Sequence, residues 1–151
     1  MRVVEIRRGE ERQRVLTYLT EEESQQLRGL PAESVVGVYT PAGLLQINSV
    51  FRAYLHEIIS IAAPLDPDMQ RAAEASGEGR LVYVDARVPE ALQPVPDEDV
   101  IGWFQIRGGK IVQGSYLPNP NHRVDGEYGL TAVLADMRQA MVNELVRRDR
   151  D

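Results

Sequence analysis

Apolar and polar residues alternate in the first part of the chain, and this period of two predicts strands. We expect strands at Val3–Arg7 and Arg12–Tyr18, joined by a turn at residues 8–11, and a third strand at Ser34–Tyr39. The segment Leu44–Ile47 fits either a partner strand or the approach to a helix, and the sequence does not decide between them.

Two helices are predicted in the same part of the chain, one between the second and third strands and one after them. Thr20 and Glu23 have the spacing of a capping box, which predicts a short helix from Glu21 to Arg28, ending before Gly29. Residues 49–63 carry apolar side chains at the spacing of one helix face, which predicts the central helix of the core. Its apolar positions are Val50, Phe51, Tyr54, Leu55, Ile58, Ile59 and Ala62.

Two more helices are expected further along the chain. Asp66 is placed to cap one of them, with Pro67 in its first turn, and this helix reaches Ser76. A long helix from Leu130 to Arg148 closes the chain. Its apolar residues recur every three or four positions, and two of them are Met137 and Met141.

Between those helices the pattern returns to strands. We expect strands at Leu81–Ala86, Val100–Arg107 and Lys110–Tyr116. Gly108-Gly109 joins the last two and is the strongest hairpin signal in the sequence, because paired glycines tolerate the positive φ angles of a two-residue turn. The proline-rich and acidic residues 88–99 predict an extended loop.

The order of these elements favours hairpins over parallel crossovers. It predicts an α+β fold with a mainly antiparallel sheet of six or seven strands, helices on one side and a long C-terminal helix. A length of 151 residues is typical of one domain, so we expect residues 1–151 to form a single α+β domain.

The composition narrows the classes of function. The chain has no cysteine, which excludes disulfides, thiolate nucleophiles and cysteine-bound metals. Its start lacks an apolar run of signal-peptide length, and no stretch reaches the roughly 20 apolar residues of a membrane span, so we expect a cytoplasmic protein with no membrane contact. With 17 basic and 23 acidic residues the net charge is −6, which argues against a nucleic-acid partner.

Polar residues gather most densely in the segment 113–128, after the predicted hairpin. A ligand could be held there by Tyr116, Asn119, Asn121, His122 and Arg123. His122 can exchange a proton near neutral pH, and Arg123 can pair with a carboxylate or phosphate. The alternative is a connector whose Asn and Asp side chains only stabilise turns, and this explanation is favoured.

A second group of candidates lies on the central helix, where polar residues recur at helical spacing. Arg52 and His56 are one turn apart there and could bind an anion, although a solvent-facing helix edge shows the same pattern. His56-Glu57 begins like the zinc motif H-E-x-x-H, but position 60 is Ser60. No nucleotide motif or calcium-loop spacing occurs, so neither cofactor nor metal is expected, and the carboxylates of loop 88–99 are expected to be solvated.

Two functions from different classes remain. The favoured one is a non-catalytic binding or assembly module that docks on a protein partner or self-associates, with Met137 and Met141 as adaptable contacts unless they pack inside their own chain. The alternative is a small acid–base or hydrolytic enzyme acting on a polar or anionic substrate through the segment 113–128.

Overall fold

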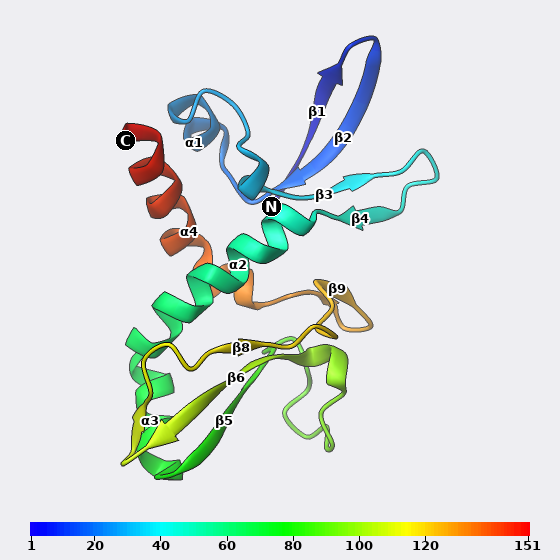
Figure 1. The fold of residues 1–151 in the computed structure, drawn as a ribbon. Helices are drawn as coiled ribbons and strands as arrows, with labels where there is room; N and C mark the ends of the chain where they lie inside the picture. The colour runs from blue at the N-terminus through cyan, green and yellow to red at the C-terminus, as the bar shows by residue number, and fades with distance from the viewer. The chain divides into compact units, whose positions relative to one another are not determined.

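A computed structural model describes residues 1–151 and confirms the α+β class, the antiparallel pairing of the strands and the long C-terminal helix (Figure 1). The chain divides into two compact units, one of residues 1–55 with 137–151 and one of residues 56–136. The helices are α1 (Glu21–Gln26), α2 (Ser49–Ala62), α3 (Pro67–Ser76) and α4 (Val133–Arg150).

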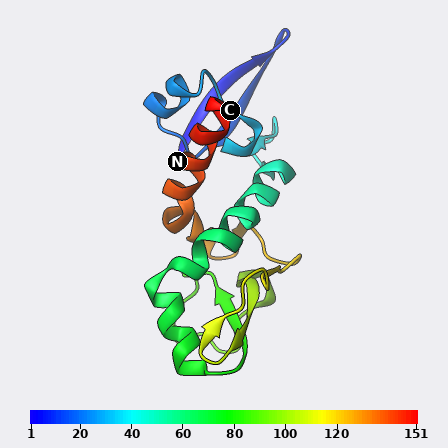
Figure 2. The same cartoon turned by 60° about the vertical axis from the view of Figure 1, so that its left-hand side comes forward.

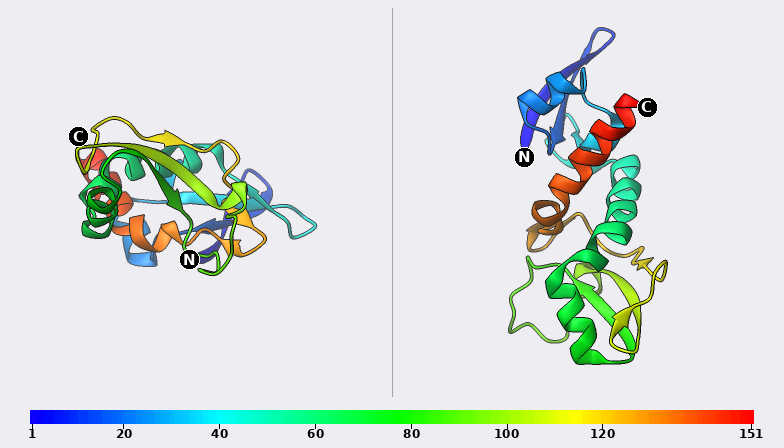
Figure 3. Two further views of the ribbon diagram at one scale, coloured as in Figure 1. Left: turned by 90° about the horizontal axis from the view of Figure 1, so that it is seen from below. Right: turned by 90° about the vertical axis from the view of Figure 1, so that its left-hand side faces the viewer.

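The first unit contains a four-stranded antiparallel sheet in the order β1-β2-β3-β4. Its strands are β1 (Arg2–Arg8), β2 (Glu11–Thr17), β3 (Val35–Tyr39) and β4 (Leu45–Ile47), which settles the open segment before α2 as a strand. Figure 3 shows the β1–β2 hairpin as a narrow ribbon that ends in its turn. Each strand pairs with the next one along the chain, and α1 lies in the connection between β2 and β3.

The capping box at α1 is confirmed. The Glu23 N–H donates to the Thr20 hydroxyl at 3.2 Å, and the Thr20 N–H donates back to the Glu23 carboxylate at 2.9 Å. The helix ends earlier than expected, at Gln26, because Arg28 adopts a positive φ of 59° and turns the chain. The two capping-box hydrogen bonds at the start of α1 each satisfy an amide that the first helical turn leaves without a partner.

The core of the first unit combines β2, the first half of α2 and most of α4. Phe51 and Leu55 are fully buried, and the Tyr54 hydroxyl donates to the Met141 carbonyl at 2.6 Å. Met137 and Met141 are also buried. The methionines of the C-terminal helix therefore pack within their own chain, the alternative left open by the sequence, and they give no support to an interface on this helix.

The second unit contains the sheet of β5 (Gly79–Val84), β6 (Val100–Arg107), β7 (Lys110–Ile111) and β8 (Leu117–Pro118). β6 pairs with the other three strands, and β5 lies at the edge. The Gly108-Gly109 turn is confirmed: Arg107 pairs with Lys110, and both glycines have positive φ angles of 58° and 72°. A small hairpin of β9 (Asp125–Gly126) and β10 (Gly129–Leu130) follows.

Helices α2 and α3 contribute to the core of this unit. Ile58 and Ile59 on α2 are buried, as predicted from their spacing. Asp66 caps α3 by accepting from the Asp68 N–H at 3.1 Å, and α3 lies alongside β5 and β7 (Figure 2). The buried Phe104 and Ile106 of β6 complete the core.

The strands form three sheets where the sequence suggested one. Hairpins pair strands that are close along the chain, and α2 and α3 separate β1–β4 from β5–β8, so each group makes its own sheet. The strand expected at Lys110–Tyr116 stops at Ile111, because Gly114 has a φ of 75° and the Ser115 hydroxyl donates to the Val112 carbonyl. The single α+β domain expected over residues 1–151 stays a prediction. None of the helices combines the length and apolar character needed to cross a membrane.

Candidate functional site

The segment 113–128 leads from β7 through β8 to the β9–β10 hairpin and is fastened to the sheet by Asn119. The Asn119 side-chain amide donates to the carbonyls of Asp97 and Val100, both at 2.8 Å, and its oxygen accepts from the Asn121 N–H at 3.1 Å. The side chain is almost completely buried. Asn119 therefore makes the local turn bonds expected of a connector and also a long-range tie to β6.

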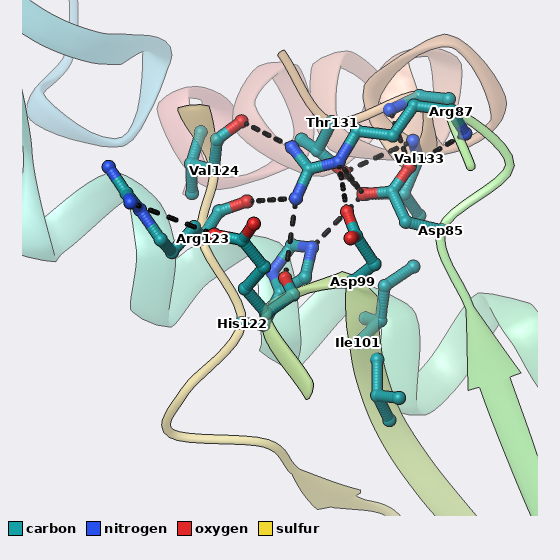
Figure 4. Close-up of polar contacts among 12 residues, drawn as sticks. Asp85, Arg87, Asp99, Ile101, His122, Arg123, Val124, Thr131 and Val133 are labelled. Carbon is teal, nitrogen blue, oxygen red and sulfur yellow. Dashed lines mark hydrogen bonds and ion pairs between the residues drawn. The ribbon is translucent and has the colours of Figure 1, made fainter. Parts of the chain in front are cut away.

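Arg87, in the loop after β5, is the centre of the polar contacts around this segment (Figure 4). Its Nη1 donates to the carbonyls of Val124 and Gly129 at 3.1 and 2.7 Å. Its Nη2 donates to the carbonyls of Arg123 and Glu98 at 2.6 and 3.3 Å. One guanidinium group thus satisfies four carbonyls from two separate loops, which the fixed fork of arginine donors makes feasible.

The remaining donor of Arg87 makes a buried ion pair. Nε lies 2.8 Å from Asp99 Oδ1 and 3.6 Å from Asp85 Oδ2, and the three side chains are at most 3% exposed. A solvated loop was expected for the acidic residues 88–99, and for Asp99 this is wrong. A carboxylate at this depth requires a charge partner, and Arg87 is that partner.

Asp85 collects four hydrogen bonds. Its Oδ2 accepts from His122 Nε2 at 3.0 Å and from the Thr131 hydroxyl, and its Oδ1 accepts from the N–H groups of Ala132 at 2.9 Å and Arg87 at 3.3 Å. Burial raises the pKa of Asp85, but these hydrogen bonds together outweigh it and leave the pKa below its ordinary value. The carboxylate is therefore ionised at neutral pH.

His122 is buried against Asp85. Because the ionised carboxylate can only accept, His122 Nε2 carries the proton of their hydrogen bond. Its Nδ1 is buried and has no hydrogen-bond partner. An aspartate that orients an imidazole is also found in acid–base catalysis, but here the histidine side chain is 0% exposed. The hydrogen bonds of Asp85 therefore hold the segment 119–131 against the end of β5.

Two further predicted residues lie next to His122. The Nδ1 atom of His56, on α2, lies 2.7 Å from the Tyr116 hydroxyl, and the rings of His56 and His122 are 6.4 Å apart at nearly a right angle. Tyr116 also contacts Phe104, with ring centroids 4.9 Å apart. His56, Tyr116 and His122 are therefore brought together, from segments up to 66 positions apart in the sequence.

The other predicted residues do not join this group. Arg123 follows His122 in the sequence, but its side chain is 66% exposed and pairs with Glu98 at 3.6 Å. Asn121 is exposed, and Arg52 belongs to the first unit. The enzyme hypothesis places its substrate on the segment 113–128, and the opposite exposure of His122 and Arg123 there gives it no support.

Sequence reasoning missed Asp85, Arg87, Asp99 and Thr131. For Asp85 a signal existed, because Leu81, Tyr83 and Asp85 share one face of the strand and the first two are apolar. A carboxylate in line with core positions indicates a buried partner. Nothing comparable marks Arg87 or Asp99, which stand among prolines and acidic residues.

The site contains no group of three or more His, Asp or Glu side chains placed to hold a metal ion. Comparison with protein-family models, with curated proteins and with solved structures finds no match for this chain. The function is therefore inferred from the arrangement of the residues alone.

Proposed function

We propose that this chain is a non-catalytic binding module that associates with a second copy of itself through the outer face of the β5–β6–β8 sheet. The observation that carries the proposal is an exposed apolar row across three strands. Val82 pairs with Trp103, and Trp103 pairs with Leu117. Directly opposed residues lie on the same face of an antiparallel sheet, so the three side chains form one strip.

This strip is open to solvent. Val82 and Leu117 are 44% and 57% exposed, Trp103 is half-buried, and Val84 at the end of β5 is also exposed. The strip contains no carboxylate, and the Arg80 guanidinium carbon lies 4.8 Å from the Trp103 ring centroid. Apolar rows rimmed by polar residues mark interaction surfaces on soluble proteins.

The composition of the strip favours a second copy as the partner. Its side chains Val82, Trp103 and Leu117 are all apolar, so two strips packed face to face are self-complementary, as a two-fold interface requires. Such packing buries the strip of each copy against that of the other and brings no carboxylate of the strip into the contact.

A non-catalytic role is supported by the buried cluster described above. Asp85, Arg87, Asp99 and His122 bond to one another, to the Thr131 hydroxyl and to backbone N–H and carbonyl groups. The cluster fixes the loop after β5 and the residues before β6 to the segment 122–132. A cytoplasmic location, expected from the sequence, is part of the same proposal.

Sedimentation velocity over a wide concentration range tests the proposal, with Val82→Glu as the disruptive variant. We expect the wild type to change from monomer to dimer, and Val82→Glu to stay monomeric because each copy would place an unpaired carboxylate in the apolar interface. Leu65→Glu is the matched control, since Leu65 is 72% exposed in the same unit but lies outside the strip. It should dimerise like the wild type. A wild type that remains monomeric up to its solubility limit would overturn the proposal, as would equal loss of dimer in both variants.

A further inference from the structure

A second surface, in the first unit, has a different character. Arg7 on β1 lies directly opposite Arg12 on β2, and Arg14 follows Arg12 by two positions. Residues that are opposed, or two apart along a strand, share a face, so three guanidinium groups lie on the same side of the hairpin. All three residues are exposed.

Placing two like charges directly opposite each other weakens a strand pair. No carboxylate lies within ion-pair distance of Arg7, Arg12 or Arg14, although Glu5 stands across from Arg14 in the register. The nearest defined contact is the Tyr39 ring, whose centroid is 5.3 Å from the Arg14 guanidinium carbon. The face therefore keeps a net positive charge, because Glu5 opposes only one of the three arginines.

A cavity opens beside Arg12 and Arg14. Arg12, Arg14 and Tyr39 line a cavity of about 650 Å³, together with the turn of residues 40–43. Glu5 and Glu11 also line it. These two carboxylates would repel an extended polyanion lying across the hairpin, whereas a compact anion can sit among the arginines.

We propose that Arg7, Arg12 and Arg14 form a binding site for a compact multivalent oxyanion, with either phosphate or carboxylate groups. The planar fork of a guanidinium matches both groups, because each presents two oxygens to two parallel N–H donors. The anion replaces the missing counter-charge between Arg7 and Arg12, and Tyr39 holds the Arg14 guanidinium over its ring face. This site is independent of the β5–β6–β8 strip, since it uses other residues and another sheet.

Isothermal titration calorimetry with two probes, inorganic pyrophosphate and succinate, tests this site at an ionic strength kept constant with sodium chloride. The test variants are Arg12→Gln and Arg14→Gln, which keep the length of the side chain and remove its charge. Arg8→Gln is the matched control, because Arg8 is on the same hairpin and exposed but faces the opposite side. Circular dichroism of each variant verifies that the fold is kept.

We expect at least one probe to bind the wild type, and its dissociation constant to rise about tenfold or more in Arg12→Gln and in Arg14→Gln, with little change in Arg8→Gln. Binding of pyrophosphate alone would assign the site to phosphate esters, and binding of succinate alone to carboxylates. Lack of binding by both probes would overturn the proposal. Equal weakening in Arg8→Gln and Arg12→Gln would do so too, because it would indicate unspecific attraction to a basic hairpin.

Discussion

The Arg87 Nε atom donates to Asp99 Oδ1 at 2.8 Å, and both side chains are nearly inaccessible to solvent. Buried ion pairs are costly to break, because the remaining charge keeps its desolvation penalty without its partner. Arg87 also donates to the carbonyls of four other residues. This single side chain therefore joins the end of β5 to the loops before β6 and after β8.

Replacement of Arg87 by methionine should lower the free energy of unfolding by about 3–5 kcal/mol, since it leaves Asp99 unpaired in the interior. Urea denaturation measures the change. Arg123→Met is the control, because Arg123 is mostly exposed and its pair with Glu98 should contribute about 1 kcal/mol or less. Adding Asp99→Leu to Arg87→Met should recover part of the loss. Similar effects of the Arg87 and Arg123 substitutions would contradict the assignment of Arg87 as the centre of the cluster.

Asp85 should make stability depend on acid pH. Its pKa in the folded protein lies below the ordinary value of 3.8, so the unfolded chain takes up the proton first as the pH falls. The stabilisation by Asp85 is therefore complete above about pH 5 and is lost progressively as the pH falls through 3.8 toward the folded pKa. Urea denaturation of wild type and Asp85→Asn at a series of pH values measures this. The variant should lose less stability on acidification, and parallel curves would contradict the prediction.

Much of the fold could be predicted because the relevant signals are local. The capping box of Thr20 and Glu23, the Asp66 cap and the Gly108-Gly109 turn each depend on residues within a few positions, and all three are confirmed. The buried face of α2 was predicted from the helical spacing of its apolar residues. In such cases residues close together in the sequence determine the local conformation.

The polar cluster could not be predicted in the same way. Asp85 bonds to His122 and Thr131, which are 37 and 46 positions away. Which loops meet depends on how the hairpins stack, and no local pattern specifies that. The sequence drew attention to His122 because of its many polar neighbours, which suggested a solvent-accessible site, whereas the side chain is buried in the core against Asp85.

The core role of α2 leads to a stability prediction with an internal control. Ile58 is 4% exposed and Ile61, three positions on, is 62% exposed. Ile58→Ala should lower the free energy of unfolding by about 2–5 kcal/mol, because it removes buried methyl and methylene groups and leaves a cavity. Ile61→Ala should change it by less than about 0.5 kcal/mol. Urea midpoints that shift equally for the two variants would contradict the assignment of the buried face.

The charges on the β1–β2 hairpin give a prediction about sign. Arg12 opposes Arg7, whereas Arg8 opposes Glu11. In a buffer without multivalent anions, Arg12→Gln should therefore stabilise the protein and Arg8→Gln should destabilise it, each by about 0.2–1 kcal/mol. Both effects should shrink as sodium chloride is added, because salt screens exposed charges. Thermal or urea denaturation at low and high salt measures them, and changes of the same sign at low salt would refute the prediction.

The proposed association through the β5–β6–β8 face is tested most directly by the fluorescence of Trp103. It is the only tryptophan in the chain and stands at the centre of the strip, between Val82 and Leu117. On dilution, its emission should move to longer wavelength and its quenching by iodide should increase, at the concentration where sedimentation shows the dimer dissociating. Val82→Glu should give the dilute-state spectrum at every concentration. Emission and quenching that stay constant across the wild-type dilution series would contradict the account.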